Sequence, residues 1–358
     1  MSKCSRCESL PSVWPEAGLL YLSPPLARTR GTIRRLLWES GLLFGDPLDG
    51  VLAVEVAPEG LRRLCELLLG GLSETELKDC KALLVEKGSS FGLGTLSRME
   101  DLATLTAAVR HEWLLDMLRE DRLAVHFQPI VSVTNPGEVF AYECLLRGLD
   151  DRGTLVSPKR MFEAARRAGL LFNLDRAART KALWRTSELR LAHRVFINFD
   201  PASIYDPEYC LKSTMGTVKR SGLSPDRVIF EATQSEAFKD HKHLRNILGF
   251  YRESGFRVSL DDLGSSYGSL ELLDALRPDF VKLDMSLIQN VDRDPYRAAI
   301  ASKLLELAKN LGVAVVAEGV ETQEQWWWLL AHDADFAQGY FFAKPAFPPP
   351  IPAYTRGT

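Results

Sequence analysis

The stretch Val258-Ser-Leu-Asp-Asp-Leu-Gly-Ser-Ser-Tyr-Gly-Ser-Leu270 joins an apolar run to two adjacent carboxylates and then to a loop rich in glycine and serine. The alternation over residues 256–260 predicts a buried strand, so Asp261 and Asp262 stand at its carboxyl end. Two acids at such a position suit a cation site, although an isolated Asp-Asp pair can equally begin a turn or cap a helix. Other predicted strands of the chain end in the same way, which favours the cation site.

Strand-like runs and helical stretches alternate after Arg122. The runs are 123–131, 139–146, 194–199, 227–231, 256–261, 279–284, 313–318 and 335–338. Eight strands separated by helices, such as 157–168 and 294–311, favour a (β/α)8 barrel over an open doubly wound sheet. Only the turn 134–138 separates the first two runs, which predicts a modified TIM barrel with an antiparallel first strand.

The carboxyl ends of the predicted strands carry polar side chains, and a barrel brings these ends to one mouth. They are Glu143, Asn198, Glu231, Asp261, Asp262, Lys282, Asp284, Glu318 and Gln338. So many carboxylates repel one another unless cations neutralise them. The candidate ligand atoms are oxygens, which favours Mg²⁺ or Mn²⁺ over structural zinc. Two such cations hydrolyse phosphate esters, so the residues predict a metal-dependent phosphoester hydrolase.

Composition narrows the class of protein and its partners. With 358 residues, 46% hydrophobic and 25% charged, the chain has room for one large domain and a smaller one. The net charge of −3 and the pI of about 6.1 give no general attraction to polyanions, so we expect no DNA or RNA polymer as partner. The sequence shows no signal peptide and no membrane span, which predicts a cytoplasmic protein without a membrane partner.

Residues 1–96 predict a small α/β domain of ferredoxin-like type that precedes the barrel. Its predicted strands are 18–22, 51–56 and 81–85, and its predicted helices are 30–43 and 58–69. Ser97 and Glu100 suit a capping box, and apolar residues then recur at helical spacing, so 97–120 is predicted to be one connecting helix.

The six cysteines are scattered and do not suit a disulfide framework. Cys4 and Cys7 leave a zinc site open as one alternative. Zinc sites usually have a second close pair of ligands, whereas Cys65 and Cys80 are far apart in sequence. We therefore favour a pair of tail thiols over a metal site.

Seven short motifs follow one another along the larger domain. They are Glu143-Cys-Leu-Leu-Arg147, Phe196-Ile-Asn198, Glu231-Ala-Thr233, Asp261-Asp-Leu-Gly264, Lys282-Leu-Asp284, Ala317-Glu-Gly-Val-Glu-Thr322 and Gln338-Gly-Tyr-Phe-Phe342. In this order they resemble the EAL domain family of cyclic di-GMP phosphodiesterases, over about residues 118–348. The resemblance implies cyclic di-GMP as substrate, linear pGpG as product and a homodimer. The predicted domains are 1–96, the connecting helix 97–120, the barrel 121–348 and a Pro-rich tail 349–358.

The resemblance also implies two bound Mg²⁺ or Mn²⁺ ions and a ligand set for each. The first set is Glu143, Asn198, Glu231 and Asp261. The second set is Asp261, Asp262 and Glu318. Asp261 is therefore expected to bridge the two ions, and Glu318 is expected to take part in catalysis as well.

Further roles follow from the same resemblance. Lys282 is expected to fix the attacking water or to stabilise the charge that grows on the phosphoryl oxygens, and Gln338 to orient the nucleophile. The expected substrate contacts are Gln128, Arg147 and Asp284. Arg147 suits a phosphate because its guanidinium can donate two parallel hydrogen bonds. Glu321 is expected to support the site without touching a metal.

The chain departs from the family pattern around the Asp-Asp loop. Gln234 stands where relatives have a glutamate that anchors this loop, and Leu263 and residues 265–268 also differ from the usual residues. An amide keeps a hydrogen bond but loses the charge, so a weaker anchor is expected. The favoured hypothesis is an active enzyme regulated by the N-terminal domain. The alternative is a catalytically weak or inactive receptor that binds cyclic di-GMP and signals through that domain.

Overall fold

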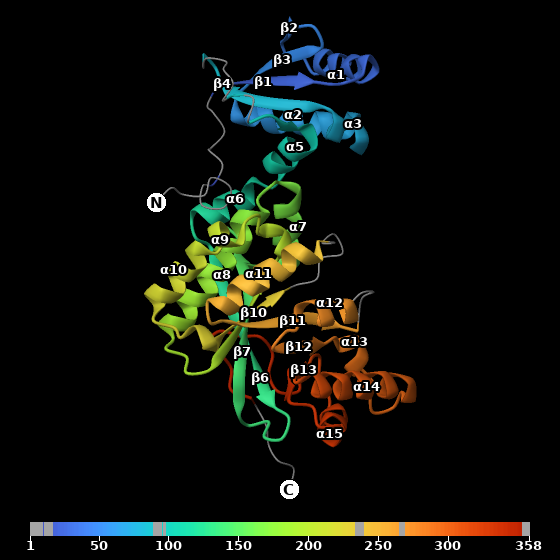
Figure 1. Ribbon diagram of the computed structural model, residues 1–358. Helices are drawn as coiled ribbons and strands as arrows, with labels where there is room; N and C mark the ends of the chain where they lie inside the picture. Colours follow the sequence, from blue (N-terminus) through green and yellow to red (C-terminus); the bar gives the residue numbers. More distant parts are fainter. Residues whose placement is uncertain are drawn as a thin grey trace. The chain divides into compact units, whose positions relative to one another are not determined.

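The computed structural model describes residues 10, 17–88, 95, 98–232, 240–264 and 269–352, apart from the side chains of His241 and Ser269. The chain divides into two compact units (Figure 1). The barrel unit consists of residues 123–149 and 175–352. The N-terminal unit consists of the described residues from 10 to 122 and of residues 150–174. The division into domains that was inferred from the sequence stays a prediction.

The N-terminal unit contains an antiparallel sheet and several helices. Its elements are β1 Gly18–Ser23, α1 Ala27–Glu39, β2 Phe44–Leu48, β3 Val51–Val56, α2 Pro58–Gly71, α3 Glu74–Asp79, β4 Lys81–Glu86, β5 Glu100–Asp101, α5 Leu102–Arg110, α6 Glu112–Arg119, β8 Leu155–Val156 and α7 Pro158–Arg167. The strand order is β2-β3-β1-β4-β5, and β1 pairs antiparallel with β3 and β4. This arrangement is ferredoxin-like, so the predicted small α/β domain is confirmed.

Alternate residues of the sheet point toward the helices and form an apolar core. On β1 and β3 these are Leu20, Leu22, Leu52 and Val54, which are fully buried together with Ile33 and Leu37 of α1. The helix predicted at 30–43 ends at Glu39, because the chain turns at Gly41 with a φ of 71° and continues into β2. Strand β2 was not predicted.

The single helix predicted at 97–120 is wrong. Residues Glu100–Asp101 pair with β4 instead, and the Asp101 carboxylate accepts a hydrogen bond from the Thr104 amide, which begins α5. At His111 the backbone leaves the helical region, so α5 ends there and α6 begins after it. Ser97, the predicted cap, lies outside the described residues.

The strands of the barrel unit close on themselves. They are β6 Leu123–Ser132, β7 Val139–Leu149, β9 Arg194–Phe199, β10 Val228–Ala232, β11 Arg257–Leu263, β12 Phe280–Leu283, β13 Ala314–Ala317 and β14 Phe336–Ala337. They are joined in the order β6-β14-β13-β12-β11-β10-β9-β7, and pairing of β7 with β6 closes the circle. Strand β6 is antiparallel to β7 and β14, whereas the other pairs are parallel. The predicted barrel with an antiparallel first strand is confirmed.

Helices connect the strands and lie outside the barrel (Figure 1). They are α8 Leu171–Glu188, α9 Pro207–Cys210, α10 Lys212–Ser221, α11 His241–Glu253, α12 Ser269–Leu276, α13 Met285–Ile288, α14 Pro295–Leu311 and α15 Gln323–Ala331, with 3-10 turns at Pro201–Ser203 and Pro225–Arg227. The bounds of α14 follow from its sequence: the Asp294 carboxylate accepts from two backbone amides, Pro295 opens the first turn, and Gly312 ends the helix with a φ of 69°.

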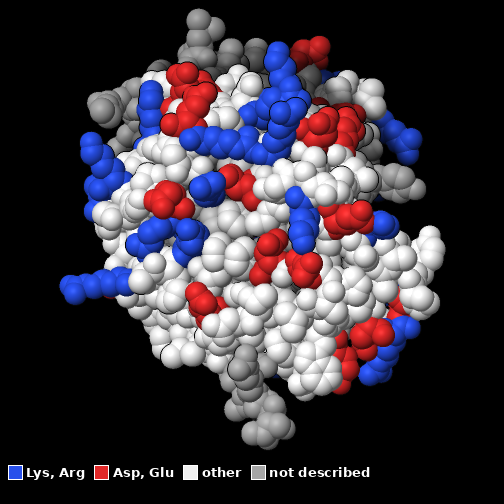
Figure 2. Space-filling model, turned by 60° about the horizontal axis from the view of Figure 1, so that its bottom comes forward, with Lys and Arg blue, Asp and Glu red and all other residues white. Residues whose placement is uncertain are grey.

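The surface carries charges of both signs. Figure 2 shows Lys and Arg side chains interspersed with Asp and Glu on one face, without a field of one sign. This distribution agrees with the small net charge of −3. Among the helices that the structure describes, none combines the length and the apolarity needed to cross a bilayer.

The barrel interior contains an apolar layer. Its members are Ile130, Ala141, Phe196, Ile229, Phe280 and Val316. A side chain two residues away along a strand points to the same side. The corresponding positions are Gln128, Glu143, Asn198, Glu231, Lys282 and Glu318. A polar layer therefore lies directly next to the apolar one, at the carboxyl ends of the parallel strands.

Candidate active site

Lys282 lies at the centre of the polar layer. Its Nζ is 3.2 Å from Glu143 Oε2, 3.0 Å from Glu231 Oε2 and 2.9 Å from Glu318 Oε1. The side chain is almost fully buried. Burial lowers the pKa of a lysine, but the surrounding carboxylates outweigh it and hold the pKa of Lys282 well above its ordinary value. Lys282 is therefore a buried, permanently charged cation at the mouth of the barrel.

Glu143 is a buried carboxylate with several donors. Its Oε1 accepts from Asn198 Nδ2 at 2.9 Å, and its Oε2 accepts from Gln338 Nε2 at 2.6 Å. Burial raises the pKa of Glu143, but the charge of Lys282 and these donors hold the pKa below its usual range. Glu143 is thus ionised, and its orientation is fixed by Asn198 on β9 and by Gln338, which directly follows β14.

Glu231 is fully buried and differs from Glu143. Lys282 lies close to it, but the approach lacks hydrogen-bond geometry, so within the described part of the chain neither Glu231 oxygen has a hydrogen-bond donor. Burial raises the pKa of Glu231 well above its usual value, and the charge of Lys282 offsets only part of this effect. A buried carboxylate that accepts no hydrogen bond costs free energy, and a bound cation would offset this cost.

Asp261 and Asp262 reach the mouth through an irregularity in β11. Adjacent residues of a regular strand point to opposite faces. The pairing of β11 with β12 shifts between Leu260 and Leu263, and Asp262 has a φ of 55°. The Asp262 amide also donates to Asp261 Oδ1 at 3.0 Å. This bulge lets two neighbouring carboxylates point into the same space.

The second predicted ligand set is brought together. Carboxylate oxygens of Asp261, Asp262 and Glu318 lie within 4.8 Å of one another. Burial, followed by the neighbouring carboxylates, raises the pKa of Asp261 to about 6, of Asp262 to about 6 and of Glu318 to about 7. Lys282 lowers these values only in part. The three carboxyl groups therefore favour a bound positive charge.

The residues present fit divalent cations. The atoms at the mouth that could ligate a metal are carboxylate and amide oxygens, the ligands that Mg²⁺ and Mn²⁺ prefer. The Glu231 oxygens, which accept no hydrogen bond within the described residues, lie in the same polar layer. The first predicted set, Glu143, Asn198, Glu231 and Asp261, is also assembled at this mouth. Its ligand roles stay a prediction, because Asn198 and Lys282 occupy the Glu143 oxygens in this arrangement.

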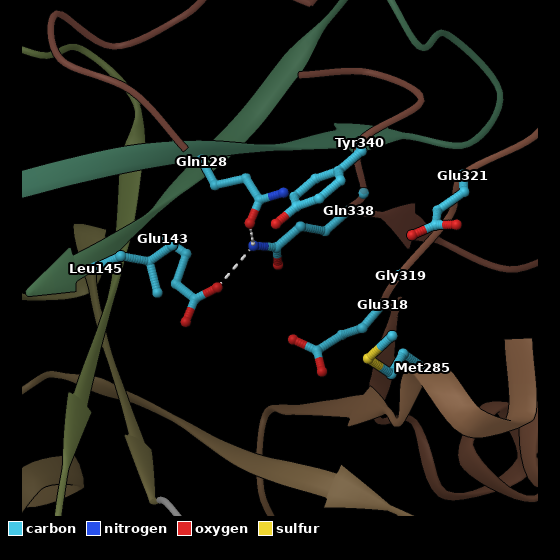
Figure 3. Close-up of a pocket in the computed structure, with 10 residues that line it drawn as sticks. Gln128, Glu143, Leu145, Met285, Glu318, Gly319, Glu321, Gln338 and Tyr340 are labelled. Atoms are coloured by element: carbon cyan, nitrogen blue, oxygen red, sulfur yellow. Dashed lines mark hydrogen bonds between the residues drawn. The ribbon is translucent and has the colours of Figure 1, made fainter. Parts of the chain in front are cut away.

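A cavity of about 250 Å³ lies beside these carboxylates. Figure 3 shows Glu143, Glu318, Gln338 and Gln128 around it. Leu145, Met285 and Tyr340 also line the cavity, and the sequence analysis did not select them. Leu145 stands two residues after Glu143 on β7, so the alternation of a strand is the signal that could have found it. Tyr340 lies in a turn after β14, where no strand alternation applies.

Arg147 and Asp284, two of the residues predicted to contact the substrate, each form a hydrogen bond with a backbone group. Arg147 follows Glu143 and Leu145 on the same face of β7, and its Nη1 donates to the Leu146 carbonyl at 2.7 Å. The Asp284 carboxylate accepts from the Ser286 amide at 2.8 Å and begins α13. Asp284 also shares a hydrogen bond with Asp262, which contributes to the raised pKa of Asp262. Glu321 lines the cavity and is exposed.

Several predicted features lie outside the described residues. They are Gln234, residues 265–268, Cys4 and Cys7. Cys65 and Cys80 are buried free thiols, and burial raises the pKa of each to about 12. A thiol with so high a pKa stays protonated and is a poor metal ligand.

Fold and mouth together define a closed, modified (β/α)8 barrel with an acidic, lysine-centred site. The model of the EAL domain family matches residues 111–345, and the chain belongs to this family. The resemblance inferred from the seven motifs is thereby confirmed.

Named relatives agree with this assignment. The Escherichia coli protein "Probable cyclic di-GMP phosphodiesterase PdeG" is 29% identical over 67% of this chain and 48% of its own length. The Pseudomonas aeruginosa protein "Cyclic di-GMP phosphodiesterase NbdA" is 31% identical over 65% of this chain and 30% of its own length. The chain thus spans about half or less of these curated relatives.

A solved structure extends the comparison. A standalone EAL protein from Vibrio cholerae in its cyclic di-GMP bound form is 35% identical and has a TM-score of 0.57. The match covers 63% of this chain and 92% of that one. The EAL domain of this chain, residues 111–345, contains the site described above, so a similarity to an EAL protein bears on it.

Proposed function

We propose that the barrel unit hydrolyses cyclic di-GMP to linear pGpG with two divalent cations, Mg²⁺ or Mn²⁺. The observation that carries the proposal is the trio Asp261, Asp262 and Glu318, which meets within 4.8 Å next to a cavity and a buried lysine. Membership of the EAL family supports it, as do the relatives named as cyclic di-GMP phosphodiesterases. The Vibrio cholerae protein, solved with cyclic di-GMP, supports the choice of ligand.

The chain's own residues would divide the work at this mouth. Glu143, Asn198, Glu231 and Asp261 would hold one cation, and Asp261, Asp262 and Glu318 the other. Bound cations would supply an activated water and neutralise charge on the phosphate. Lys282 would stabilise the charge that grows on the phosphoryl oxygens as the 3′ oxygen leaves.

Gln338, Arg147 and Asp284 would act on the water and the substrate. The Gln338 amide would orient the attacking water, and Arg147 would bind a phosphate through its fork of donors. Asp284 would fix Asp262 through their shared hydrogen bond, in addition to its predicted contact with substrate. Glu321 would contribute a carboxylate at the rim of the cavity.

The test is a product assay on the full chain. Purified protein is incubated with cyclic di-GMP and Mg²⁺ or Mn²⁺, and pGpG is separated and quantified by chromatography. We expect product with either cation and none after chelation. The isosteric variant Glu231→Gln, which removes a predicted ligand charge, should lower turnover by about a hundredfold or more.

A matched control and a binding measurement separate the two candidate functions. Glu306→Gln changes an exposed carboxylate that pairs with Lys303 on α14, and it should leave turnover unchanged. Calorimetry measures cyclic di-GMP binding to the same preparation. Binding without pGpG in either metal would exclude the enzyme and leave the cyclic di-GMP receptor as the function.

We also propose that the N-terminal unit regulates the barrel and that Gln234 weakens the anchor of the Asp-Asp loop. Gln234→Glu restores the charge that relatives have, so it should change both turnover and metal dependence; no change in either would contradict this. The homodimer and the cytoplasmic location stay predictions. Light scattering on the eluting protein tests the homodimer.

A further inference from the structure

Gln128 and Gln338 form a hydrogen-bonded pair whose direction is set by a backbone carbonyl. Gln128 Nε2 donates to the carbonyl oxygen of Ala343 at 3.2 Å, and Gln338 Nε2 donates to Gln128 Oε1 at 3.0 Å. Both glutamines are buried. A backbone carbonyl can only accept, so Gln128 must turn its NH₂ group toward Ala343 and its oxygen toward Gln338. Gln338 must in turn present its NH₂ group to Gln128.

The acceptor at Ala343 is held by the backbone. The Ala343 amide donates to the Gly339 carbonyl at 3.2 Å. Nearby, Ala346 and Phe127 exchange two backbone hydrogen bonds of 2.9 and 3.1 Å, which fasten this segment to the strand that carries Gln128. The Ala343 carbonyl belongs to the backbone and cannot rotate as a side chain does. It therefore sets the orientation of the Gln128 amide and, through it, of the Gln338 amide.

The side-chain oxygen of Gln338 points into the interior of the mouth, toward the carboxylates. It is buried and has no donor within the described part of the chain. Figure 3 shows it on the side of the amide away from Gln128, toward the space between Glu143 and Glu318. An oxygen at this place can accept a hydrogen bond from water, whereas a flipped amide would offer only donors. The orientation of the amide thus decides whether Gln338 can orient a water by accepting a hydrogen bond from it.

Glu143 also holds the Gln338 amide, through the 2.6 Å bond to Glu143 Oε2. In the proposed function, however, Glu143 binds a cation, which occupies lone pairs of the same carboxylate. Gln128 uses its Nε2 for Ala343 and its Oε1 for Gln338. Its hydrogen bond with the Gln338 amide therefore does not compete with a cation.

We propose that Gln128 is a positioning residue that fixes the Gln338 amide so that its oxygen faces the attacking water. The inference rests on the proposed phosphodiesterase function, and it differs from the expectation that Gln128 contacts the substrate. A substrate contact acts on KM, whereas a residue that orients the nucleophile through Gln338 acts on kcat.

Two substitutions at position 128 separate these roles. Gln128→Met keeps the length of the side chain but removes its donor and acceptor, so we expect kcat to fall about ten- to a hundredfold with KM changed less than about twofold. Gln128→Glu keeps an acceptor for the Gln338 NH₂ group although it loses the donor to Ala343, so we expect it to lose less of its kcat than Gln128→Met. A rise in KM without a fall in kcat, or equal losses in both variants, would overturn the proposal.

A double-mutant cycle tests whether Gln128 acts through Gln338. If it does, Gln128→Met adds no further loss of kcat in a protein that already carries Gln338→Met. Independent roles would instead multiply the two losses, and that result would overturn the proposal. Thermal unfolding establishes that each variant is folded at the assay temperature.

A readout without turnover separates this inference from the proposed function. In protein labelled with ¹⁵N-glutamine, the NH₂ resonances of Gln338 are those that Gln338→Met removes. We expect these protons to exchange with solvent at least about tenfold more slowly than those of exposed glutamines, and one of them to lose this protection in Gln128→Met. Unprotected protons in the wild type would overturn the positioning role. Protected protons in a wild type that makes no pGpG would contradict the phosphodiesterase alone.

Discussion

The two units of this protein place their charged residues in opposite ways. The N-terminal core consists of apolar side chains such as Leu20 and Leu52, while charges such as Arg34 and Asp46 pair at the surface. In the barrel, a buried lysine and several carboxylates fill a layer directly next to an apolar one. Buried charge costs free energy unless it is paired. The barrel therefore loses some stability by holding these charges together, whereas the apolar N-terminal core avoids this cost.

Removing the central cation should have the largest effect. Lys282→Met leaves Glu143, Glu231 and Glu318 together without their shared positive charge. We expect the metal-free protein to lose about 3–5 kcal/mol of unfolding free energy and turnover to fall about a hundred- to a thousandfold. Urea unfolding in the presence of a chelator and the pGpG assay measure the two effects.

The control for Lys282 is a lysine of the same unit at the surface. Lys309 pairs with Asp333, and both side chains are largely exposed. Lys309→Met should change the unfolding free energy by less than about 0.5 kcal/mol. Equal losses in the two variants would mean that buried and exposed charge do not differ here.

Binding of a divalent cation should restore part of the unfolding free energy that the clustered carboxylates of the mouth cost. Because a cation binds the folded carboxylates and not the unfolded chain, Mg²⁺ or Mn²⁺ at a hundred times its dissociation constant should add about 2.7 kcal/mol of stability. Asp262→Asn, which removes one charge of the trio, should reduce this gain. Calorimetric unfolding with and without chelator measures it, with the exposed Asp333→Asn as the matched control.

The strands were predictable because barrel strands are short apolar runs that end in polar residues. The i, i+2 spacing of Phe196 and Asn198, or of Phe280 and Lys282, already separates an apolar from a polar layer. This pattern predicts most of the residues that lie at the mouth, and the family motifs add the role expected of each. Strand β2 lacks such a pattern, since Asp46 and Pro47 interrupt it at the edge of its sheet.

Two features of the site depend on backbone geometry that no residue pattern shows. Asp261 and Asp262 share one face only because of the bulge and the positive φ of Asp262. The direction of the Gln338 amide depends on the carbonyl of Ala343, which a different segment brings to Gln128. Such contacts arise from tertiary packing, so the sequence named these residues without fixing their contacts.

A pair of glycine substitutions compares the two units directly. A Cβ at Gly339 would lie 2.0 Å from the Val320 oxygen and 2.3 Å from its nitrogen. Gly339→Ala should therefore cost about 2–3 kcal/mol and lower turnover by displacing Gln338. Gly31 lies within α1 with nothing within 4 Å, so Gly31→Ala should stabilise the N-terminal unit by about 0.5–1 kcal/mol. Thermal unfolding measures both, and equal signs would contradict the comparison.

The smallest expected effect concerns a carboxyl group of the N-terminal unit. Burial, followed by the charge of Asp101, raises the pKa of Glu100 from 4.5 to about 7. Folding therefore favours its protonated form: the group carries no penalty below pH 4.5, and its penalty grows until about pH 7 and then stays constant. Because part of the group reaches solvent, we expect Glu100→Gln to stabilise the unit by about 1–2 kcal/mol above pH 7.

Urea unfolding from pH 4 to pH 8 checks the sign for Glu100. The gain from Glu100→Gln should be absent at pH 4 and complete near pH 8, while the exposed Glu66→Gln should show no such trend. A gain that is already present at pH 4 would show that burial of charge is not its cause. In the barrel mouth, Lys282 offsets part of the same kind of penalty for Asp261 and Glu318. A pH-dependent gain at Glu100 would therefore show, within one chain, what a buried carboxyl costs when it serves no bound cation.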